Sequence, residues 1–281
     1  MHPTPLRIPV AGGELAGHRT GRGPPALVLH GGPAMEDYTG PLAAELAGLI
    51  DSVRYTQRGV APSLEDGPFT IEQHVEDAVA AIDAIGAEQA WIVGHSWGGH
   101  LALHLAVAHP ERVRGVVAIG TLGADGAVFG PFGAALREQA GPAGTALLDA
   151  IEQRRRDGVV TEAELVERNA IVWPAYFADP AAATPPPDRI GVQSSRETNA
   201  SIGAHFAAGT LRDGLPGVRR PLLVVHGALD PMPARFAEQT AALVPGSEVR
   251  IVDGVAHFPW AERPGCVAAV VGPWLAALAP A

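Results

Sequence analysis

The chain has 281 residues, of which 47% are hydrophobic and 18% charged, a composition typical of a folded globular protein. Its formal net charge of -10 argues against a nucleic-acid partner, because phosphate backbones are bound by basic surfaces. The single cysteine, Cys266, excludes an internal disulfide and a cysteine-based metal site. Because no signal-peptide pattern and no apolar run of about 18 residues is found, we expect a cytoplasmic protein that does not enter a membrane.

The first part of the chain alternates short apolar runs with amphipathic segments. Continuous apolar runs are expected of strands that are buried on both faces of a sheet, and the capping box at residues 70–73 predicts a helix that Gly86 ends. The repeated strand–helix order implies a parallel sheet with helices on both faces. The expected elements are a hairpin over 6–10 and 14–20, strands over 26–29, 52–56, 90–93 and 113–119, and helices over 41–49, 70–86 and 100–109.

This alternation stops at Gly120 and resumes about a hundred residues later. The intervening segment is rich in Ala, Glu, Arg and Pro and lacks buried-strand runs, and a second capping box begins at Thr161. We therefore expect a helical cap over 123–217, inserted between the two parts of a core that covers 1–122 and 218–281. In the last part, strands are expected over 222–226 and 248–252 and helices over 234–243 and 266–278.

The motif Gly94-His95-Ser96-Trp97-Gly98 lies between an apolar run and a helix-like segment. A strand, a tight turn and a helix are the context in which Gly-x-Ser-x-Gly forms a nucleophile elbow. The turn strains the serine backbone and lifts the hydroxyl above the sheet, and glycines leave room for neighbouring backbone. We therefore predict that Ser96 is a nucleophile.

A serine nucleophile needs a base and an acid that orients the base, and these follow the elbow in the order Asp or Glu, then His. Asp230 comes directly after the apolar run 222–226, and His257 comes just after the expected strand 248–252. Both positions lie at the edge of the sheet that carries Ser96. A turn aspartate and a surface-loop histidine are the plainer alternatives, and Asp125 is a competing acid.

Acyl transfer also requires donors for the negative charge that develops on the carbonyl oxygen. The backbone N–H of Trp97 lies at the positive end of the helix after Ser96. The second donor is expected in the His30-Gly31-Gly32 loop after the first buried strand, at Gly32. The alternative for these glycines is a simple tight turn.

Three motifs together resemble a known family: Gly94-His95-Ser96-Trp97-Gly98-Gly99, His30-Gly31-Gly32-Pro33 and Gln57-Arg58-Gly59. They are similar to motifs of the α/β-hydrolase superfamily and, within it, of the proline iminopeptidase group. That group typically carries His-Gly-Gly-Pro-Gly and Asp-Gln-Arg-Gly, so Ala34 and Thr56 depart from its pattern. The resemblance implies an α/β-hydrolase fold with a mostly parallel eight-stranded sheet and a helical cap.

The resemblance also implies a way to bind substrate. In the proline iminopeptidase group, acidic cap residues bind the free amino group of the substrate, and the nearest candidate here is Glu197. A solvated helix carboxylate is the alternative for that residue. Gly31 and Trp173 are further candidates for substrate contact.

We therefore expect a serine hydrolase that forms an acyl-enzyme on Ser96, with His257 as base and then as acid. The first expectation is removal of a small N-terminal residue from a short peptide or amide. A carboxylesterase or lactonase acting on small hydrophobic esters is the alternative, and a lyase or a non-catalytic binding protein on the same fold is a more distant one. No cofactor and no metal is expected.

Overall fold

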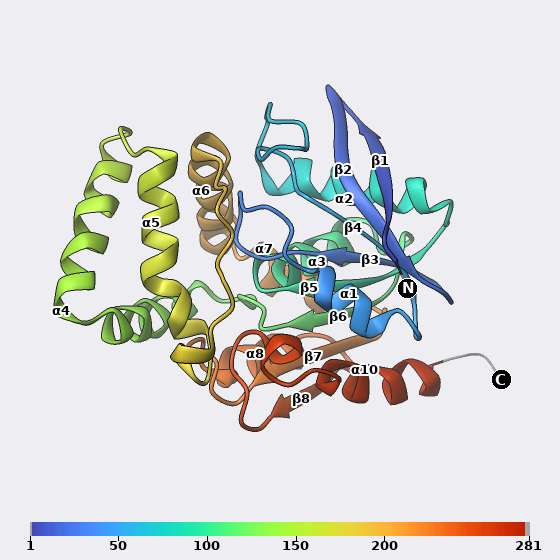
Figure 1. The fold of residues 1–281 in the computed structure, drawn as a ribbon. Coiled ribbons are helices and arrows are strands. Elements are labelled where there is room, and N and C mark those ends of the chain that lie inside the picture. Colours follow the sequence, from blue (N-terminus) through green and yellow to red (C-terminus); the bar gives the residue numbers. More distant parts are fainter. Residues whose placement is uncertain (1, 279–281) are drawn as a thin grey trace.

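The computed structural model describes residues 2–278, and its strands form one eight-stranded sheet (Figure 1). The strand order is β1-β2-β4-β3-β5-β6-β7-β8. The hairpin β1–β2 and the β2–β4 pair are antiparallel, and the other pairs are parallel. This confirms the mostly parallel sheet. The strands are β1 (Thr4–Val10), β2 (Gly13–Gly21), β3 (Pro25–Leu29), β4 (Asp51–Tyr55), β5 (Ala90–His95), β6 (Val113–Ile119), β7 (Leu222–Gly227) and β8 (Glu248–Val252).

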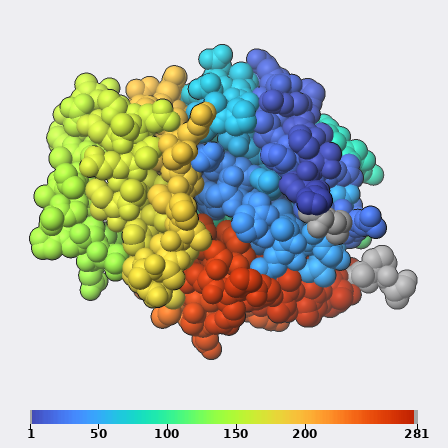
Figure 2. All heavy atoms as spheres, viewed as in Figure 1, coloured from blue at the N-terminus to red at the C-terminus, as the bar shows by residue number. Residues whose placement is uncertain are grey.

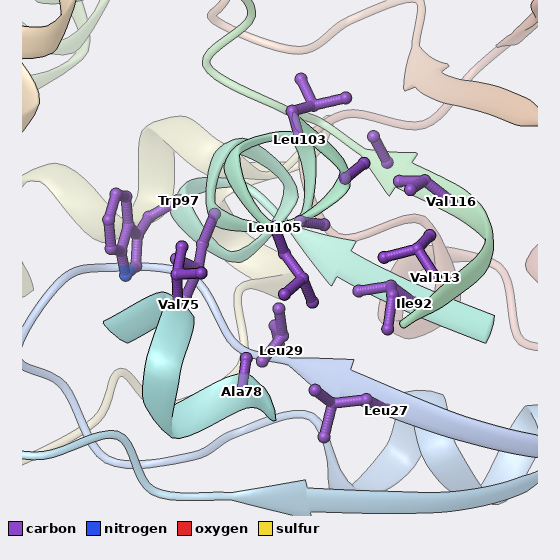
Figure 3. Packing of buried hydrophobic residues seen from close by; sticks show 14 of the residues in the cluster. Leu27, Leu29, Val75, Ala78, Ile92, Trp97, Leu103, Leu105, Val113 and Val116 are labelled. Carbon is purple, nitrogen blue, oxygen red and sulfur yellow. The ribbon is translucent and has the colours of Figure 1, made fainter. Parts of the chain in front are cut away.

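Helices cover both faces of the sheet because each central strand is apolar on both sides. In β3, Leu27 and Leu29 pack into one buried cluster, while Ala26 and Val28 pack into another. Figure 3 shows the first cluster, in which Leu29 lies near Ala78 of one helix and Leu105 of another. That face is covered by α2 (Ile71–Ile85), α3 (Trp97–Ala108) and α8 (Ala234–Ala242), and the other by α1 (Gly40–Leu46), α9 (Pro259–Glu262) and α10 (Cys266–Ala277).

The two predicted capping boxes differ in the structure. At Thr161 both reciprocal hydrogen bonds with Glu164 are present. At Thr70 only half of the box forms. The Thr70 hydroxyl accepts from the backbone N–H of Gln73, but the side-chain Nε2 of Gln73 donates to Asp77 at 3.1 Å. The nearby carboxylate therefore competes with the backbone for the Gln73 side chain.

The segment between β6 and β7 is helical, as expected. Figure 1 places α4 and α5 at one side of the molecule, with α6 nearer the sheet. Figure 2 shows α4 and α5 as a yellow-green lobe beside the rest of the surface. A break at Gly141, followed by Pro142, bends α4. The elements are η1 (Gly126–Val128), α4 (Phe129–Arg156), α5 (Glu162–Val172), η2 (Trp173–Tyr176), η3 (Pro180–Ala182), α6 (Val192–Ala208), α7 (Thr210–Gly214) and η4 (Leu215–Gly217).

We refer to residues 123–217 as the helical insertion. That these residues form a cap domain separate from the core stays a prediction. Within residues 2–278, no helix combines the length and hydrophobicity that a bilayer-spanning segment requires.

Candidate active site

Ser96 occupies a strained turn between β5 and α3. Its φ of 55° lies in the left-handed region, which costs a residue other than glycine about 1–3 kcal/mol. The flanking glycines are required by close backbone contacts: a Cβ on Gly94 would lie 2.2 Å from the carbonyl oxygen of Gly98, and one on Gly98 would lie 2.2 Å from that of Leu29. The local geometry is that of the predicted elbow.

Asp230 and His257 meet at the carboxyl ends of β7 and β8. Oδ2 of Asp230 accepts a hydrogen bond from Nδ1 of His257 at 2.7 Å, and its Oδ1 accepts from the Met232 N–H at 2.8 Å. Both side chains are buried. The competing acid Asp125 instead accepts from the Ala127 N–H at 2.9 Å, where it begins η1. The geometry therefore favours Asp230 as the partner of His257.

Ser96 and His257 both adjoin the end of β6. The Ser96 N–H donates to the carbonyl oxygen of Ile119 at 2.8 Å, and a Cβ on Gly120 would lie 2.9 Å from Nδ1 of His257. Among the described contacts, no hydrogen bond joins the Ser96 hydroxyl to His257. In unliganded enzymes such bonds are often long and shorten when substrate binds. Gly120, which sequence reasoning did not single out, leaves the space that the Asp230–His257 pair needs.

The Gly31–Gly32 peptide is oriented by His30. Nε2 of His30 accepts from the Gln57 N–H at 3.0 Å, so Nδ1 carries the proton and donates to the Gly31 carbonyl oxygen at 2.8 Å. In a trans peptide the C=O and the following N–H point in opposite directions, so the Gly32 N–H points away from His30. Within residues 2–278, the N–H groups of Gly32 and Trp97 donate to no protein acceptor, and both residues line the same cavity as Ser96. This arrangement suits the two predicted oxyanion donors.

Gly31 was expected to contact substrate, but its backbone N–H is bound within the protein. Its N–H donates to the hydroxyl of Tyr38 at 2.9 Å, so it is not free to bind substrate. The Tyr38 hydroxyl is also 2.8 Å from Nδ1 of His95, whose Nε2 is 2.8 Å from the carbonyl oxygen of His257. Because a carbonyl only accepts, Nε2 of His95 carries the proton and Tyr38 donates to Nδ1. Burial lowers the pKa of His95 well below its usual value, which keeps this ring neutral.

A cavity of about 460 Å³ lies between Ser96 and the helical insertion. Its apolar wall is formed largely by α4 and α5, and its polar groups include three arginines. Arg137 pairs with Asp149 at 3.2 Å, and Arg155 lies 3.6 Å from Glu152. The apolar lining residues of the insertion are Phe129, Phe132, Leu136, Leu148, Leu165, Val172, Ile190 and Ile202.

Arg168 is the third arginine of the cavity. It is half-buried, and its guanidinium makes no hydrogen bond or ion pair with any of residues 2–278. Its neighbour Asn169 is 2% exposed, also lines the cavity, and has a side-chain Nδ2 without a hydrogen-bond partner. A buried donor without a partner is costly. The two side chains therefore offer donors to a ligand, and sequence reasoning missed both because many arginines of the insertion have the same local pattern.

Tyr176 was also missed as a site residue. It stacks on His257 with ring centroids 4.9 Å apart at 29°, and its carbonyl oxygen accepts the His257 N–H at 2.9 Å. Burial raises the pKa of Tyr176 to about 12, so its hydroxyl stays neutral at ordinary pH. The only sequence signal was its membership of an aromatic group in the insertion.

Two candidates for substrate contact lie outside the lining of this cavity. Glu197 accepts from Gln193 at 3.0 Å and from Arg196 at 3.2 Å on the surface of α6. Trp173 is buried among aromatic rings, and its indole donates to the Thr184 carbonyl oxygen at 2.7 Å. The cavity lining includes neither residue. No cluster of three metal-ligating side chains is found within residues 2–278.

Comparisons with known proteins agree with this architecture. Residues 26–270 match the alpha/beta hydrolase family. The chain is 32% identical over 294 aligned residues to a 2-hydroxymuconate semialdehyde hydrolase of Pseudomonas putida, with 97% of this chain and 96% of that protein covered.

Solved structures add similarity of fold alone. A 2-hydroxy-6-oxo-6-phenylhexa-2,4-dienoate hydrolase of Rhodococcus sp. strain RHA1 matches with a TM-score of 0.69 and 20% identity, covering 98% of this chain and 97% of that one. A proline iminopeptidase of Mycobacterium smegmatis matches with a TM-score of 0.68 and 21% identity, covering 97% and 98%.

The expected likeness to proline iminopeptidases therefore rests on loop motifs and fold, whereas the similarity over nearly the whole sequence is to a semialdehyde hydrolase. Together with the match over residues 26–270, that similarity shows that the chain belongs to the alpha/beta hydrolase family.

Proposed function

We propose that this protein is a serine hydrolase of small substrates that carry a carboxylate. Ser96 is the nucleophile, His257 the base, and Asp230 the residue that orients the base. The observation that carries the substrate class is the unpaired Arg168 beside Asn169 in the cavity that contains Ser96.

The reaction proceeds through an acyl-enzyme. The Ser96 hydroxyl attacks the substrate carbonyl carbon while Nε2 of His257 takes its proton. The oxygen that becomes negative accepts hydrogen bonds from the N–H groups of Gly32 and Trp97. Collapse breaks the bond from the carbonyl carbon to the leaving group, which takes the proton from His257. A water, deprotonated by His257, then attacks the acyl carbon and releases the acid product and free Ser96.

A carboxylate on the substrate matches the polar groups that Arg168 and Asn169 supply to the cavity. It accepts from the Arg168 guanidinium and from Nδ2 of Asn169, and so pairs a half-buried cation and a buried donor at once. Hydrogen bonds to charged groups are worth about 1.5–3 kcal/mol, or roughly 10- to 150-fold in binding. The word muconate in the name of the 32% identical relative denotes a carboxylate, which supports the same class.

This proposal replaces aminopeptidase activity as the first expectation. A free amino group needs an unpaired carboxylate, and Glu197, the residue expected to supply it, does not line the cavity. The carboxylate that does line it, Glu152, lies 3.6 Å from Arg155. The net positive lining favours an anion over an ammonium group.

The test compares matched substrates. The wild type and the Ser96→Ala variant are assayed on an aryl ester with a terminal carboxylate, on its neutral methyl-ester analogue, and on prolyl and alanyl arylamides. We expect Ser96-dependent hydrolysis with kcat/KM at least 10-fold higher for the carboxylate ester. Equal values for both esters would contradict the substrate class, and preference for free-amine arylamides would restore the aminopeptidase.

Arg168→Gln measures the proposed contact directly. We expect it to lower kcat/KM for the carboxylate ester about 10- to 100-fold and to leave the neutral ester within about 2-fold. Arg137→Gln is the matched control, because Arg137 lines the same cavity but is paired with Asp149. Loss of the same size with both esters would mean that Arg168 acts on the fold and not on the carboxylate.

A further inference from the structure

Gln57 is the first residue of the Gln57-Arg58-Gly59 motif. None of these three residues has a role in the proposed reaction. Gln57 follows β4, is 1% exposed, and contacts two segments that are distant along the chain. Its side-chain Nε2 is 3.0 Å from the His30 carbonyl oxygen, and its Oε1 is 2.8 Å from Nε1 of the Trp97 indole. Its backbone N–H donates to Nε2 of His30 at 3.0 Å.

The partners of Gln57 allow only one orientation of its amide. The His30 carbonyl oxygen only accepts, and the Trp97 indole N–H only donates. The side-chain NH₂ must therefore face His30 and the side-chain oxygen must face Trp97. A residue without both a donor and an acceptor at this position loses at least one of these contacts.

Each contact leads to one of the two oxyanion donors. On one side, the Gln57 side chain holds the His30 carbonyl oxygen, and with it the peptide that leads into Gly31, while the Gln57 backbone N–H holds the His30 ring. The ring in turn holds the Gly31 carbonyl oxygen at 2.8 Å, and this sets the direction of the Gly32 N–H. On the other side, Gln57 holds the indole of Trp97, whose backbone N–H is the second donor. Gln57 is thus a direct link between the His30–Gly32 loop and the first residue of α3.

We propose that Gln57 is a positioning residue that sets the separation and direction of the Gly32 and Trp97 N–H groups for the oxyanion. This inference rests on the proposed serine hydrolase function and deepens it. The oxyanion develops only in the transition state, so a loss of position lowers kcat more than it raises KM. A displacement of the order of 1 Å can cost about 100-fold in rate.

The test uses an inhibitor that forms the oxyanion. A trifluoromethyl ketone with a terminal carboxylate adds to a serine hydroxyl and places a negative oxygen between the two donors. The carboxylate product of the ester binds the same cavity without forming that oxygen. The two inhibition constants therefore separate the oxyanion donors from the rest of the site.

Gln57→Leu removes the two side-chain contacts at similar volume and keeps the backbone N–H that holds the His30 ring. Trp97→Phe removes only the indole contact while keeping the backbone N–H of residue 97. For Gln57→Leu we expect kcat to fall about 100-fold, KM to stay within about 3-fold, and the trifluoromethyl ketone to bind about 100-fold more weakly. Binding of the carboxylate product should not change. Trp97→Phe should cause a smaller loss that is not additive with Gln57→Leu.

Ser52→Ala is the matched control on β4, the strand that leads to Gln57. Its buried hydroxyl donates to the Thr20 carbonyl oxygen at 3.0 Å and contacts neither His30 nor Trp97. This variant should unfold at a lower temperature than the wild type while binding the trifluoromethyl ketone equally well. Equal weakening in Ser52→Ala would mean that the inhibitor reports general loss of stability, and would overturn the inference.

Binding of the trifluoromethyl ketone by folded Gln57→Leu within about 2-fold of the wild type would overturn the positioning role. If that variant does not fold, unchanged inhibition of Trp97→Phe would overturn it. Absence of Ser96-dependent turnover and inhibition in the wild type would instead overturn the proposed function, and the role of Gln57 with it.

Discussion

The Asp230 carboxylate holds the His257 ring through a 2.7 Å hydrogen bond between Oδ2 and Nδ1. Since the carboxylate accepts, the proton of the neutral ring is on Nδ1, and Nε2 is the free lone pair. The Met232 N–H holds the other carboxylate oxygen at 2.8 Å, so the acid cannot rotate freely. This relationship defines which ring nitrogen acts as the base in the proposed reaction.

The first prediction concerns the acid. Asp230→Asn should lower kcat about 10⁴-fold, because an amide stabilises the wrong tautomer of the histidine. Steady-state kinetics on the carboxylate ester measure this. Asp125→Asn is the control, since Asp125 only accepts from the Ala127 N–H and should retain nearly full activity. The reverse order of losses would make Asp125 the acid.

The second prediction concerns Gly120. A Cβ here would lie 2.9 Å from Nδ1 of His257 and 3.2 Å from Oδ2 of Asp230, and the residue has a φ of +51°. Gly120→Ala should therefore displace the pair and lower kcat at least 10-fold, even where circular dichroism shows a folded protein. Gly48→Ala, which places its Cβ in open space, should leave kcat unchanged. Full activity of Gly120→Ala would show that the pair tolerates displacement.

The third prediction concerns the ring that stacks on His257. Tyr176→Phe keeps the ring, and because burial raises the pKa of the Tyr176 hydroxyl to about 12, losing that hydroxyl should not change the pH–rate profile below pH 9. Tyr176→Ala removes the stacking surface and should lower kcat about 10-fold or more. The comparison of kcat for the two variants checks this, and equal loss in both would assign the effect to the hydroxyl.

The fourth prediction concerns acid stability. Burial lowers the pKa of His74 to about 3 and that of His100 to about 4, below the value of 6.5 expected in the unfolded chain. Above pH 6.5 neither state binds the proton, so these groups do not affect stability. Below pH 6.5 the unfolded state binds it first, so each histidine lowers the free energy of unfolding by about 1.4 kcal/mol per pH unit until its folded pKa is reached.

Urea unfolding of the wild type and of His74→Gln between pH 7 and pH 4.5 isolates one of these groups. Glutamine is always neutral and has a donor for Thr198, the present partner of His74 at 3.1 Å. The variant should lose stability less steeply with acid, by about 1.4 kcal/mol per pH unit. Identical slopes would mean that His74 is protonated in the folded protein.

Much of the fold and part of the candidate site follow from local sequence. The turn at Ser96 requires glycine at positions 94 and 98 because neighbouring backbone leaves no room for a Cβ, and this requirement is visible in the motif itself. The apolar runs predict β5 to β8, and carboxyl ends of parallel strands meet at one edge of a sheet. That rule is sufficient to bring Asp230 and His257 together.

Which residues line the cavity depends on the tertiary structure. On α6, Ser195, Asn199 and Ile202 line the cavity, whereas Glu197 lies two residues after Ser195 and is rotated by about 200° around the helix. Sequence resemblance pointed to the charged residue, and helix rotation decided that it faces away from the cavity.

The sequence by itself determined the strand–helix order, because that order depends on local periodicity. It also predicted the three residues of the proposed reaction, from the backbone space at the elbow and from the meeting of strand ends at one edge of the sheet. Only the tertiary structure decided that Arg168 and Asn169 line the same cavity as Ser96, that Tyr176 stacks on His257, and that Gln57 links His30 to Trp97. These contacts join segments far apart in the chain. Their physical basis is the packing of the helical insertion and two loops over one sheet edge, which no local pattern encodes.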